Sequence, residues 1–160
     1  MKIEALSHTF AVRKLGAEDV GPIYDLCCKN KIFYQYHPPL VTKESIFEDM
    51  AALPPGKNYN DKFYIGFFDN KTMVAIMDLV LDYPEKGIAF IGFFMMNLEY
   101  QNKGIGSKII NECNHYLQKL GCKKVCLGVD KNNPQSNAFW KKNGFITIGE
   151  NEYILMELVL

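Results

Sequence analysis

The order of apolar and polar positions divides this chain into a helical first part, a strand-rich centre and a mixed second half. In the first part, apolar residues such as Val20, Ile23 and Cys27 recur every three or four positions, which is typical of a helix with one buried face. We expect a strand at 10–14, a helix at 17–30, an aromatic-rich loop at 31–40, and a helix from Thr42 to the stop at Pro54-Pro55.

The centre changes to apolar runs that are typical of strands. Residues 62–69 and 73–82 predict a hairpin, and residues 88–96 predict a third strand after a turn that contains Pro84 and Gly87. The run that ends at Met96 is the longest apolar stretch, yet it has only about half the length that a membrane-spanning helix needs. It is therefore predicted to be a buried strand.

The second half begins with a helix at 106–120, whose apolar residues fall on one face and which ends at Gly121. A strand at 124–129 follows, so strand, helix and strand form a parallel crossover that is expected to be right-handed. A helix from Pro134 to Gly144 and strands at 145–148 and 152–160 complete the chain. The fold class is α+β: one domain, 1–160, with a mixed, mostly antiparallel sheet of six to seven strands covered by about four helices.

Composition narrows the choice of partners. With 160 residues, 48% of them hydrophobic, the chain can bury one core. The formal net charge is zero, so no overall field favours nucleic acid or an anionic membrane, and neither partner is expected. The segment 1–10 has no long apolar core typical of a signal peptide, which predicts a cytoplasmic protein.

Cysteine and histidine do not form a pattern that would bind metal. The five cysteines are an odd number and are expected to be reduced. Cys122 and Cys126 have a spacing that zinc ligands use, but no second Cys/His pair lies near them in sequence, and the three histidines are far apart. No metal site is predicted.

The segment Tyr100–Ser107, with the sequence YQNKGIGS, has the properties of a phosphate-binding loop. A helix N-terminus presents unpaired N–H groups and a partial positive charge, and glycines let the backbone approach an anion closely. Lys103 or Lys108 would add charge, and a tight turn without a ligand is the alternative. The loop lacks the Gly-Lys-Ser/Thr ending of a nucleoside-triphosphate loop and follows three strands instead of opening a dinucleotide fold, which argues against both of those classes.

The pattern Gln101-x-x-Gly104-x-Gly106 resembles the acetyl-CoA loop of the GNAT N-acetyltransferase superfamily, in which Arg or Gln is followed after two residues by Gly and then, one residue on, by Gly or Ala. The segment 133–145 is similar to the late helix of that family, and the order of elements agrees along nearly the whole chain. The resemblance implies a parallel strand pair that splays at the acyl-CoA site. It also implies direct transfer of an acetyl group from acetyl-CoA to a primary amine of a small molecule or protein. A non-catalytic acyl-CoA-binding or regulatory module is the alternative, and the resemblance is compatible with a homodimer.

The resemblance also implies which residues contact acetyl-CoA. At the splay, backbone groups of 94–96 would bind the pantetheine arm, while their side chains pack in the core. For Asn133, capping of the following helix is the alternative role, and Lys141 or Lys142 would either approach a CoA phosphate or lie on a solvated face. The full predicted set is Phe94, Met95, Met96, Gln101, Asn102, Lys103, Gly104, Ile105, Gly106, Ser107, Asn133, Asn137 and Trp140.

Trp140 is the main departure from the family pattern, because many relatives have Tyr there as the acid that protonates the departing thiolate. An indole N–H is not a usable acid at neutral pH. The chemistry remains feasible, since a thiol with a pKa of about 8.5 can leave as thiolate or take its proton from water. The alternative role of Trp140 is an aromatic wall beside the cofactor.

A base must remove the proton of the acceptor ammonium, and the strand at 88–96 contains no carboxylate. Asp78 and Asp82 on the preceding strand are the candidates, with Glu99 in the loop as another, and each also fits a structural or solvated carboxylate. The predicted acceptor pocket for a small-molecule or peptide amine consists of Tyr34, Tyr36 and His37, for which core packing is the alternative.

Overall fold

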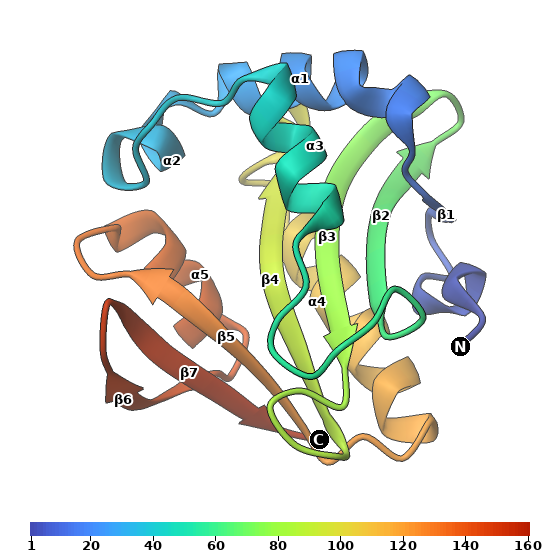
Figure 1. Ribbon diagram of the computed structural model, residues 1–160, viewed down its shortest axis with the longest axis vertical. Coiled ribbons are helices and arrows are strands. Elements are labelled where there is room, and N and C mark those ends of the chain that lie inside the picture. The colour runs from blue at the N-terminus through green and yellow to red at the C-terminus, as the bar shows by residue number, and fades with distance from the viewer.

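The computed structural model describes all 160 residues as a seven-stranded sheet in the order β1-β2-β3-β4-β5-β7-β6 (Figure 1). Neighbouring strands are antiparallel except for β4 and β5, which run parallel. The strands are β1 Ala11–Lys14, β2 Lys62–Asp69, β3 Thr72–Leu81, β4 Ile88–Met96, β5 Lys124–Asp130, β6 Ile146–Glu150 and β7 Tyr153–Val159. The helices are α1 Val20–Lys29, α2 Lys31–Tyr36, α3 Lys43–Ala51, α4 Ile105–Lys119 and α5 Pro134–Lys142, with 3₁₀ turns at Ile3–Leu6, Ala17–Asp19 and Leu98–Tyr100. The predicted mixed α+β sheet is confirmed.

Helices cover both faces of the sheet and bury two separate clusters of apolar side chains. On one face, α1 and α3 pack on β2–β4 through residues that include Ile23, Ile46 and Ile76. On the other face, α4 and α5 pack over the centre through residues that include Ile109 and Trp140. The strands β2, β3 and β4 each contribute side chains to both clusters, so they form the buried centre of the sheet.

The predicted loop at 31–40 is wrong in its first half, because residues 31–36 form α2. The backbone leaves the helical region at Asn30 (φ −84°, ψ 56°), which separates α2 from α1. Phe33 then packs edge-on against Phe93 of β4, with ring centroids 5.7 Å apart. This tertiary contact stabilises a helix too short to form by itself. It also places α2 beyond the upper ends of β4 and β5 (Figure 1).

The parallel pair β4–β5 separates part-way along its length. Paired residues run only from Ile88 opposite Lys124 to Ile91 opposite Leu127, although β4 continues to Met96 (Figure 1). On its other side, β4 remains paired with β3, but the register shifts so that Gly92 has no partner residue. A bulge of this kind bends a strand and increases its twist, and it lies where β5 departs. The splay is therefore built into β4. No helix of the structure has the length and apolar character needed to cross a membrane.

Candidate functional site

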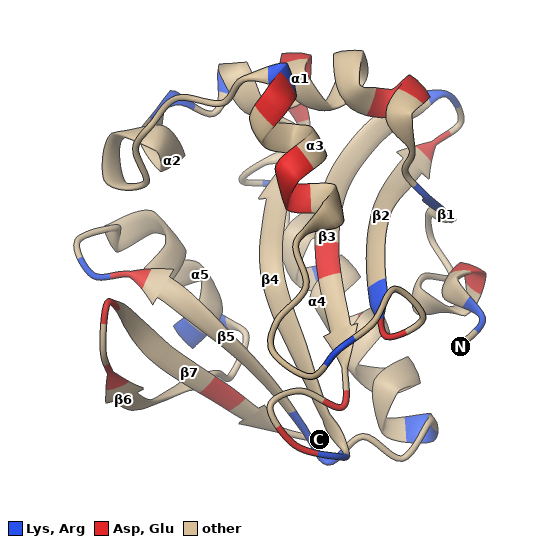
Figure 2. Cartoon of the chain, viewed as in Figure 1, with Lys and Arg blue, Asp and Glu red and all other residues tan.

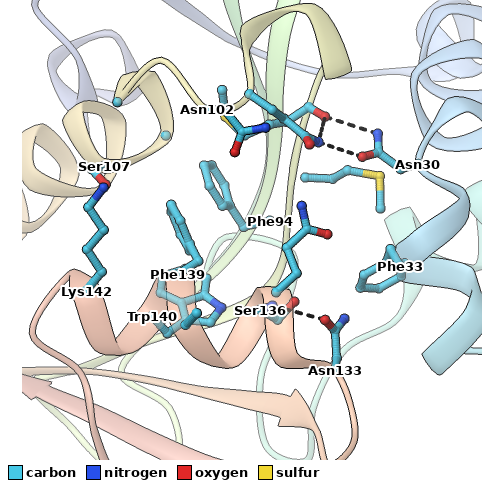
Figure 3. Close-up of a pocket in the computed structure, with 17 residues that line it drawn as sticks. Asn30, Phe33, Phe94, Asn102, Ser107, Asn133, Ser136, Phe139, Trp140 and Lys142 are labelled. Atoms are coloured by element: carbon cyan, nitrogen blue, oxygen red, sulfur yellow. Dashed lines mark hydrogen bonds between the residues drawn. The ribbon is translucent and has the colours of Figure 1, made fainter.

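A cavity of about 470 Å³, called here the loop cavity, lies between the end of β4, the start of α4 and the side of α5 (Figure 3). One basic residue, Lys142, lines it, and no carboxylate does. Its walls are Asn30, Phe33, Phe94, Met95, Met96, Gln101, Asn102, Gly104, Gly106, Ser107, Asn133, Gln135, Ser136, Ala138, Phe139, Trp140 and Lys142. The cavity therefore offers apolar walls, amide groups and one positive charge.

The loop before α4 and the first turn of this helix form one wall of the cavity. Asn102 and Gly104 adopt left-handed conformations, with φ of 59° and 75°, which turn the chain sharply into the helix. The N–H groups of residues 102–107 donate no hydrogen bond within the chain, and the first bonded amide is that of Lys108, to the carbonyl of Gly104 (3.0 Å). A run of unpaired N–H groups at a helix N-terminus is the arrangement that binds phosphate.

Gly106 lets the start of α4 approach its neighbours. A Cβ added there would lie 3.1 Å from the Phe139 ring and 3.5 Å from the Met96 side chain, which is tighter than ordinary contact for the ring. Both neighbours line the loop cavity. A larger residue would therefore push the cavity wall inward, beside the unpaired amides.

Gln101 contacts the protein through its side chain instead of pointing freely into the cavity. Its Nε2 donates to Asn30 Oδ1 (2.7 Å) and to the Met96 carbonyl (3.2 Å), and Asn30 Nδ2 donates to the same carbonyl (3.1 Å) (Figure 3). These bonds join the end of α1, the end of β4 and the loop. Asn30 was missed in the sequence, which offers no local signal for a partner 71 residues away.

Asn133 caps α5 and also lines the loop cavity. Its Oδ1 accepts from the N–H of Ser136 (3.0 Å), which is the predicted cap of α5. The side chain is almost fully buried at the cavity wall, and its Nδ2 donates no bond within the chain, so it can donate into the cavity. Asn137 differs from expectation: its amide donates to the Asn133 carbonyl (2.9 Å), and it does not line the cavity.

Successive residues of β4 direct their backbone N–H and C=O groups alternately toward β3 and toward the side of β5. Only some of the backbone groups of 94–96 that were predicted to bind the pantetheine arm can therefore face the splay. The N–H of Asn97 donates to the carbonyl of Val74 (2.8 Å), so the backbone groups of Met95 also face β3. Those of Phe94 and Met96 face the open side, where the Met96 carbonyl is already bonded. The N–H of Phe94 and the N–H of Met96 are therefore the donors left at the splay.

Trp140 belongs to an aromatic cluster in the wall of the loop cavity. Its ring packs edge-on against Phe139 and Phe145, both with centroids 5.0 Å away, and lies 5.9 Å from Phe94. The side chain is 7% exposed, and its Nε1–H has no partner within the chain. These contacts fit the alternative role given to Trp140 in the sequence analysis, that of an aromatic wall beside the cofactor.

A second cavity of about 260 Å³, called here the splay cavity, lies between the diverging ends of β4 and β5 beneath α2. It shares Phe33, Phe94, Ser136 and Trp140 with the loop cavity, so the two adjoin. β4 carries no charged residue, and Asp130 is the charged residue at this end of β5 (Figure 2). Most of the lining is aromatic or aliphatic. The full set of lining residues is Phe33, His37, Phe90, Ile91, Gly92, Phe93, Phe94, Leu127, Gly128, Val129, Asp130, Ser136, Trp140 and Tyr153.

His37 is the predicted acceptor residue that lines this cavity, where its Nδ1 lies 3.0 Å from Asp130 Oδ1. Tyr34 and Tyr36 line neither cavity. Tyr34 packs against the cluster beneath α1 and α3, and burial raises the pKa of its phenol. Phe33, which the sequence analysis did not single out, occupies the wall instead.

The predicted carboxylate bases lie outside both cavities. Asp78 forms a buried ion pair with Lys62 (2.7 Å), and burial raises its pKa while the hydrogen bond from Lys62 opposes that effect. Asp82 lies far from the splay, because it follows β3 at the end of the sheet opposite to the one where β4 and β5 separate. There its Oδ1 accepts a hydrogen bond from the Gly87 N–H (2.6 Å). Glu99 is exposed after β4 and lines neither cavity.

Among the predicted loop residues, Gln101, Asn102, Gly104, Gly106 and Ser107 line the loop cavity. Lys103 and Ile105 do not line it, and neither does Lys108. The positive charge comes instead from Lys142 of α5, which lies at the same end of the cavity as Ser107 (Figure 3). No group of three or more His, Cys, Asp or Glu side chains is placed to hold a metal ion.

The model of the Acetyltransferase (GNAT) family matches residues 26–145, which include the loop, the splay and the lining of both cavities except Tyr153. The chain belongs to the GNAT acetyltransferase family. It is 27% identical to the ribosomal-protein-serine acetyltransferase of Escherichia coli K12 over 154 residues, covering 90% of this chain and 83% of that protein. It is also 31% identical to the chloroplastic GCN5-related N-acetyltransferase 4 of Arabidopsis thaliana over 184 residues, covering 90% of this chain and 63% of that protein.

Solved structures share the GNAT fold. The PaiA N-acetyltransferase of Thermoplasma acidophilum, solved in complex with coenzyme A, superposes with a TM-score of 0.72 at 21% identity, covering 95% of this chain and 99% of that one. An acetyltransferase of Thermus thermophilus gives 0.76 at 19% identity, covering 94% and 97%. Family membership and the acetyltransferase relatives confirm the predicted activity, the transfer of an acetyl group from acetyl-CoA to an amine.

Proposed function

We propose that this GNAT enzyme binds acetyl-CoA in the loop cavity and its amine acceptor in the splay cavity, with transfer where the two cavities adjoin. One observation carries the proposal: the wall of unpaired amides and the aromatic cavity meet at Phe94 and Trp140. The first cavity suits a phosphate-bearing ligand, since its lining combines N–H donors and Lys142 without a carboxylate.

The protein groups that would hold acetyl-CoA fit its chemistry. The unpaired amides of the four lining residues of this segment, with Lys142, match the pyrophosphate; these residues are Asn102, Gly104, Gly106 and Ser107. Asn133 Nδ2 and the free N–H groups of β4 match the amides and carbonyls of an extended pantetheine arm. Acetyl-CoA supplies the acetyl group as an activated thioester, and the Phe94 N–H is the donor that we expect to polarise its carbonyl.

We expect direct transfer, without an acetyl group carried on a cysteine of the enzyme. None of the five free cysteines lines either cavity. Burial raises the pKa of Cys27 to about 11, so this thiol near α2 is protonated at neutral pH. The acceptor amine is then the attacking group.

The composition of the splay cavity also favours a class of acceptor. Asp130 is its carboxylate, and His37 already occupies one carboxylate oxygen. A second ammonium, as in a polyamine, finds no further acidic partner in this lining, whereas an apolar or aromatic group meets Phe33, Phe93 and Tyr153. We propose that the acceptor is a primary amine attached to an apolar group.

The test is release of CoA thiol from acetyl-CoA in the presence of a panel of amines. The panel contains benzylamine and phenylethylamine, spermidine, amino acids, an aminoglycoside and short peptides with free N-termini. Aromatic and alkyl monoamines should give the highest kcat/KM, above spermidine by about tenfold or more. Faster turnover of spermidine would contradict the acceptor class, and thiol release that no amine accelerates would contradict transfer to an amine.

A further inference from the structure

The splay cavity contains an imidazole whose two nitrogens have different surroundings. His37, just beyond the end of α2, is held by Asp130 at the end of β5: Nδ1 lies 3.0 Å from Oδ1. The ring also lies near those of Phe33, with centroids 5.2 Å apart, and Tyr153, with centroids 6.4 Å apart and ring planes at 29°. Nε2 has no partner within the chain, and 44% of the side chain is exposed.

The partner of Nδ1 fixes where the proton of the neutral ring resides. An ionised carboxylate can only accept hydrogen bonds, so the bond to Asp130 requires the proton on Nδ1. The lone pair of the neutral imidazole is then on Nε2. This is the arrangement in which a histidine accepts a proton, with a carboxylate that orients the ring and stabilises the resulting imidazolium.

Other titratable groups near the cavity are less suited to this role. Tyr153 offers only a hydroxyl group, which is a much weaker base than an imidazole. Asp49 of α3 lies within Coulombic reach of His37, but it is exposed and does not line the cavity. Lys131, next to Asp130, forms an exposed pair with Glu150 (2.7 Å). Asp78 is paired with Lys62 outside both linings.

We propose that His37 is the catalytic base that accepts the proton of the acceptor ammonium, and that Asp130 is its positioning residue. The inference rests on the proposed binding of the acceptor in the splay cavity. Nε2 removes one proton from R–NH₃⁺, and the freed lone pair forms the C–N bond to the acetyl carbon as the C–S bond breaks. The second amine proton goes to the departing sulfur, and His37 releases the first proton to solvent. The products are the amide, CoA thiol and one proton.

The first experiment distinguishes a catalytic role of His37 as a base from a purely structural role by comparing two acceptors of similar shape. Ethylamine is protonated at neutral pH, whereas the fluorines of 2,2,2-trifluoroethylamine leave most of its nitrogen neutral. His37→Asn retains an N–H near the position of Nδ1, so it can still bond Asp130, but it has no base. We expect kcat/KM for ethylamine to fall about 100-fold, since general bases contribute that much or more, and for the fluorinated amine to fall by less than about threefold.

Two further variants complete this experiment. His115→Asn is the matched control, because His115 lies on the exposed side of α4 outside both cavities, and it should leave both rates unchanged. Asp130→Asn should reduce the ethylamine rate by about tenfold, less than the loss of the base itself. Affinity for CoA, measured by calorimetry, should remain that of the parent in both His37→Asn and Asp130→Asn.

A second measurement does not depend on turnover. Nitrogen-15 NMR of histidine-labelled protein above neutral pH should show the proton of the His37 ring on Nδ1, and Asp130→Asn should remove that preference. A proton on Nε2 in the parent would overturn the assignment.

The possible failures can be told apart. Equal losses for the two amines in His37→Asn, or no loss with either, would overturn the inference while the parent enzyme still acetylates amines. A parent that acetylates neither these amines nor any member of the panel would overturn the proposed acceptor chemistry, and the assignment of His37 with it.

Discussion

Gly106 sets how closely the start of α4 approaches the cavity wall, and this contact can be tested directly. In Gly106→Val, the added side chain would press on Phe139 and Met96 beside the unpaired amides. We expect the Kd for CoA to rise at least about tenfold, a loss of about 1.4 kcal/mol or more, measured by calorimetry. Gly21→Val is the matched control, because nothing lies within 4 Å of a Cβ at that position in α1, and it should bind CoA like the parent. Undiminished affinity in Gly106→Val would place the phosphate site elsewhere.

Trp140 differs from the family pattern, and its packing suggests a specific order of effects. Removal of this 7% exposed ring in Trp140→Ala should lower the free energy of unfolding by about 3–5 kcal/mol in urea denaturation. Trp140→Phe keeps an aromatic face against Phe139 and Phe145, so it should retain most of kcat, whereas Ala should not. If the Nε1–H instead donates to the departing sulfur, kcat will fall equally in Phe and Ala, with KM for acetyl-CoA little changed.

Two residues singled out in the sequence owe their local conformations to their immediate neighbours. Gly104 adopts a left-handed conformation and Asn133 caps the helix that Pro134 begins, and both roles are set by immediate neighbours. His37 was placed in the acceptor pocket, but its bond to Asp130 joins residues 93 apart and could not be predicted from spacing. Such pairs depend on how the sheet places α2 beside β5, which only the three-dimensional structure specifies.

At the scale of elements, an ion pair fastens β1 to the start of α1. Both terminal nitrogens of Arg13 donate to Asp19, at 2.8 and 2.7 Å, and the Gly16 N–H donates to the same carboxylate. These bonds, first of all those from Arg13, hold the pKa of Asp19 below its ordinary value. The connection between β1 and α1 therefore depends on an ionised aspartate.

The pH dependence of this connection follows from the direction of the shift. Because the folded-state pKa of Asp19 is depressed, its contribution is complete above the unfolded pKa of about 3.9 and is lost as pH falls further. Asp19→Asn should cost about 1 kcal/mol at pH 7, since Arg13 is half-exposed, and the difference from the parent should shrink below pH of about 4. Asp25→Asn, an exposed position in α1 without an ion pair, should change stability by less than about 0.5 kcal/mol at either pH. Denaturant titrations at pH 7 and below pH of about 4 measure the free energy of unfolding of both variants and the parent. A difference between Asp19→Asn and the parent that stayed the same at both pH values would contradict this account.

Most helices and strands were predictable because the spacing of their apolar residues matches the face of each element that is buried in the structure. The hairpin of β2 and β3, the crossover through α4 and the cap of α5 lie close to the expected residues. α2 was missed because its helical state depends on Phe33 meeting Phe93, a contact between segments 60 positions apart that no local period encodes. The separation of β5 from β4 was implied by the family resemblance. Its physical cause, the bulge at Gly92, appears only in the register of the sheet.

At the scale of the whole molecule, ligand binding should stabilise the fold. A ligand at 100 times its Kd adds about 2.7 kcal/mol to the free energy of unfolding. For a chain of this size, that corresponds to a rise in Tm of roughly 5–10 °C. Thermal unfolding with and without excess CoA measures it, and Gly106→Val at the same CoA concentration should show a much smaller rise. An unchanged Tm in the parent would contradict binding to the folded state.

The splay of β4 from β5 separates the active site into a part that tolerates sequence change and a part that does not. The donors of β4 and of the loop belong to the main chain, so they persist through almost any replacement of side chains that preserves the path of the backbone. The splay cavity, by contrast, owes its chemistry to side chains such as His37, Phe33 and Asp130, and each substitution there alters what it admits. The path of the main chain can therefore persist while side chains diverge, and the fold is shared at the 19–21% identity of the two solved structures. Under the proposed roles of the two cavities, retention of acetyl-CoA binding and change of the acceptor involve different atoms of the same chain.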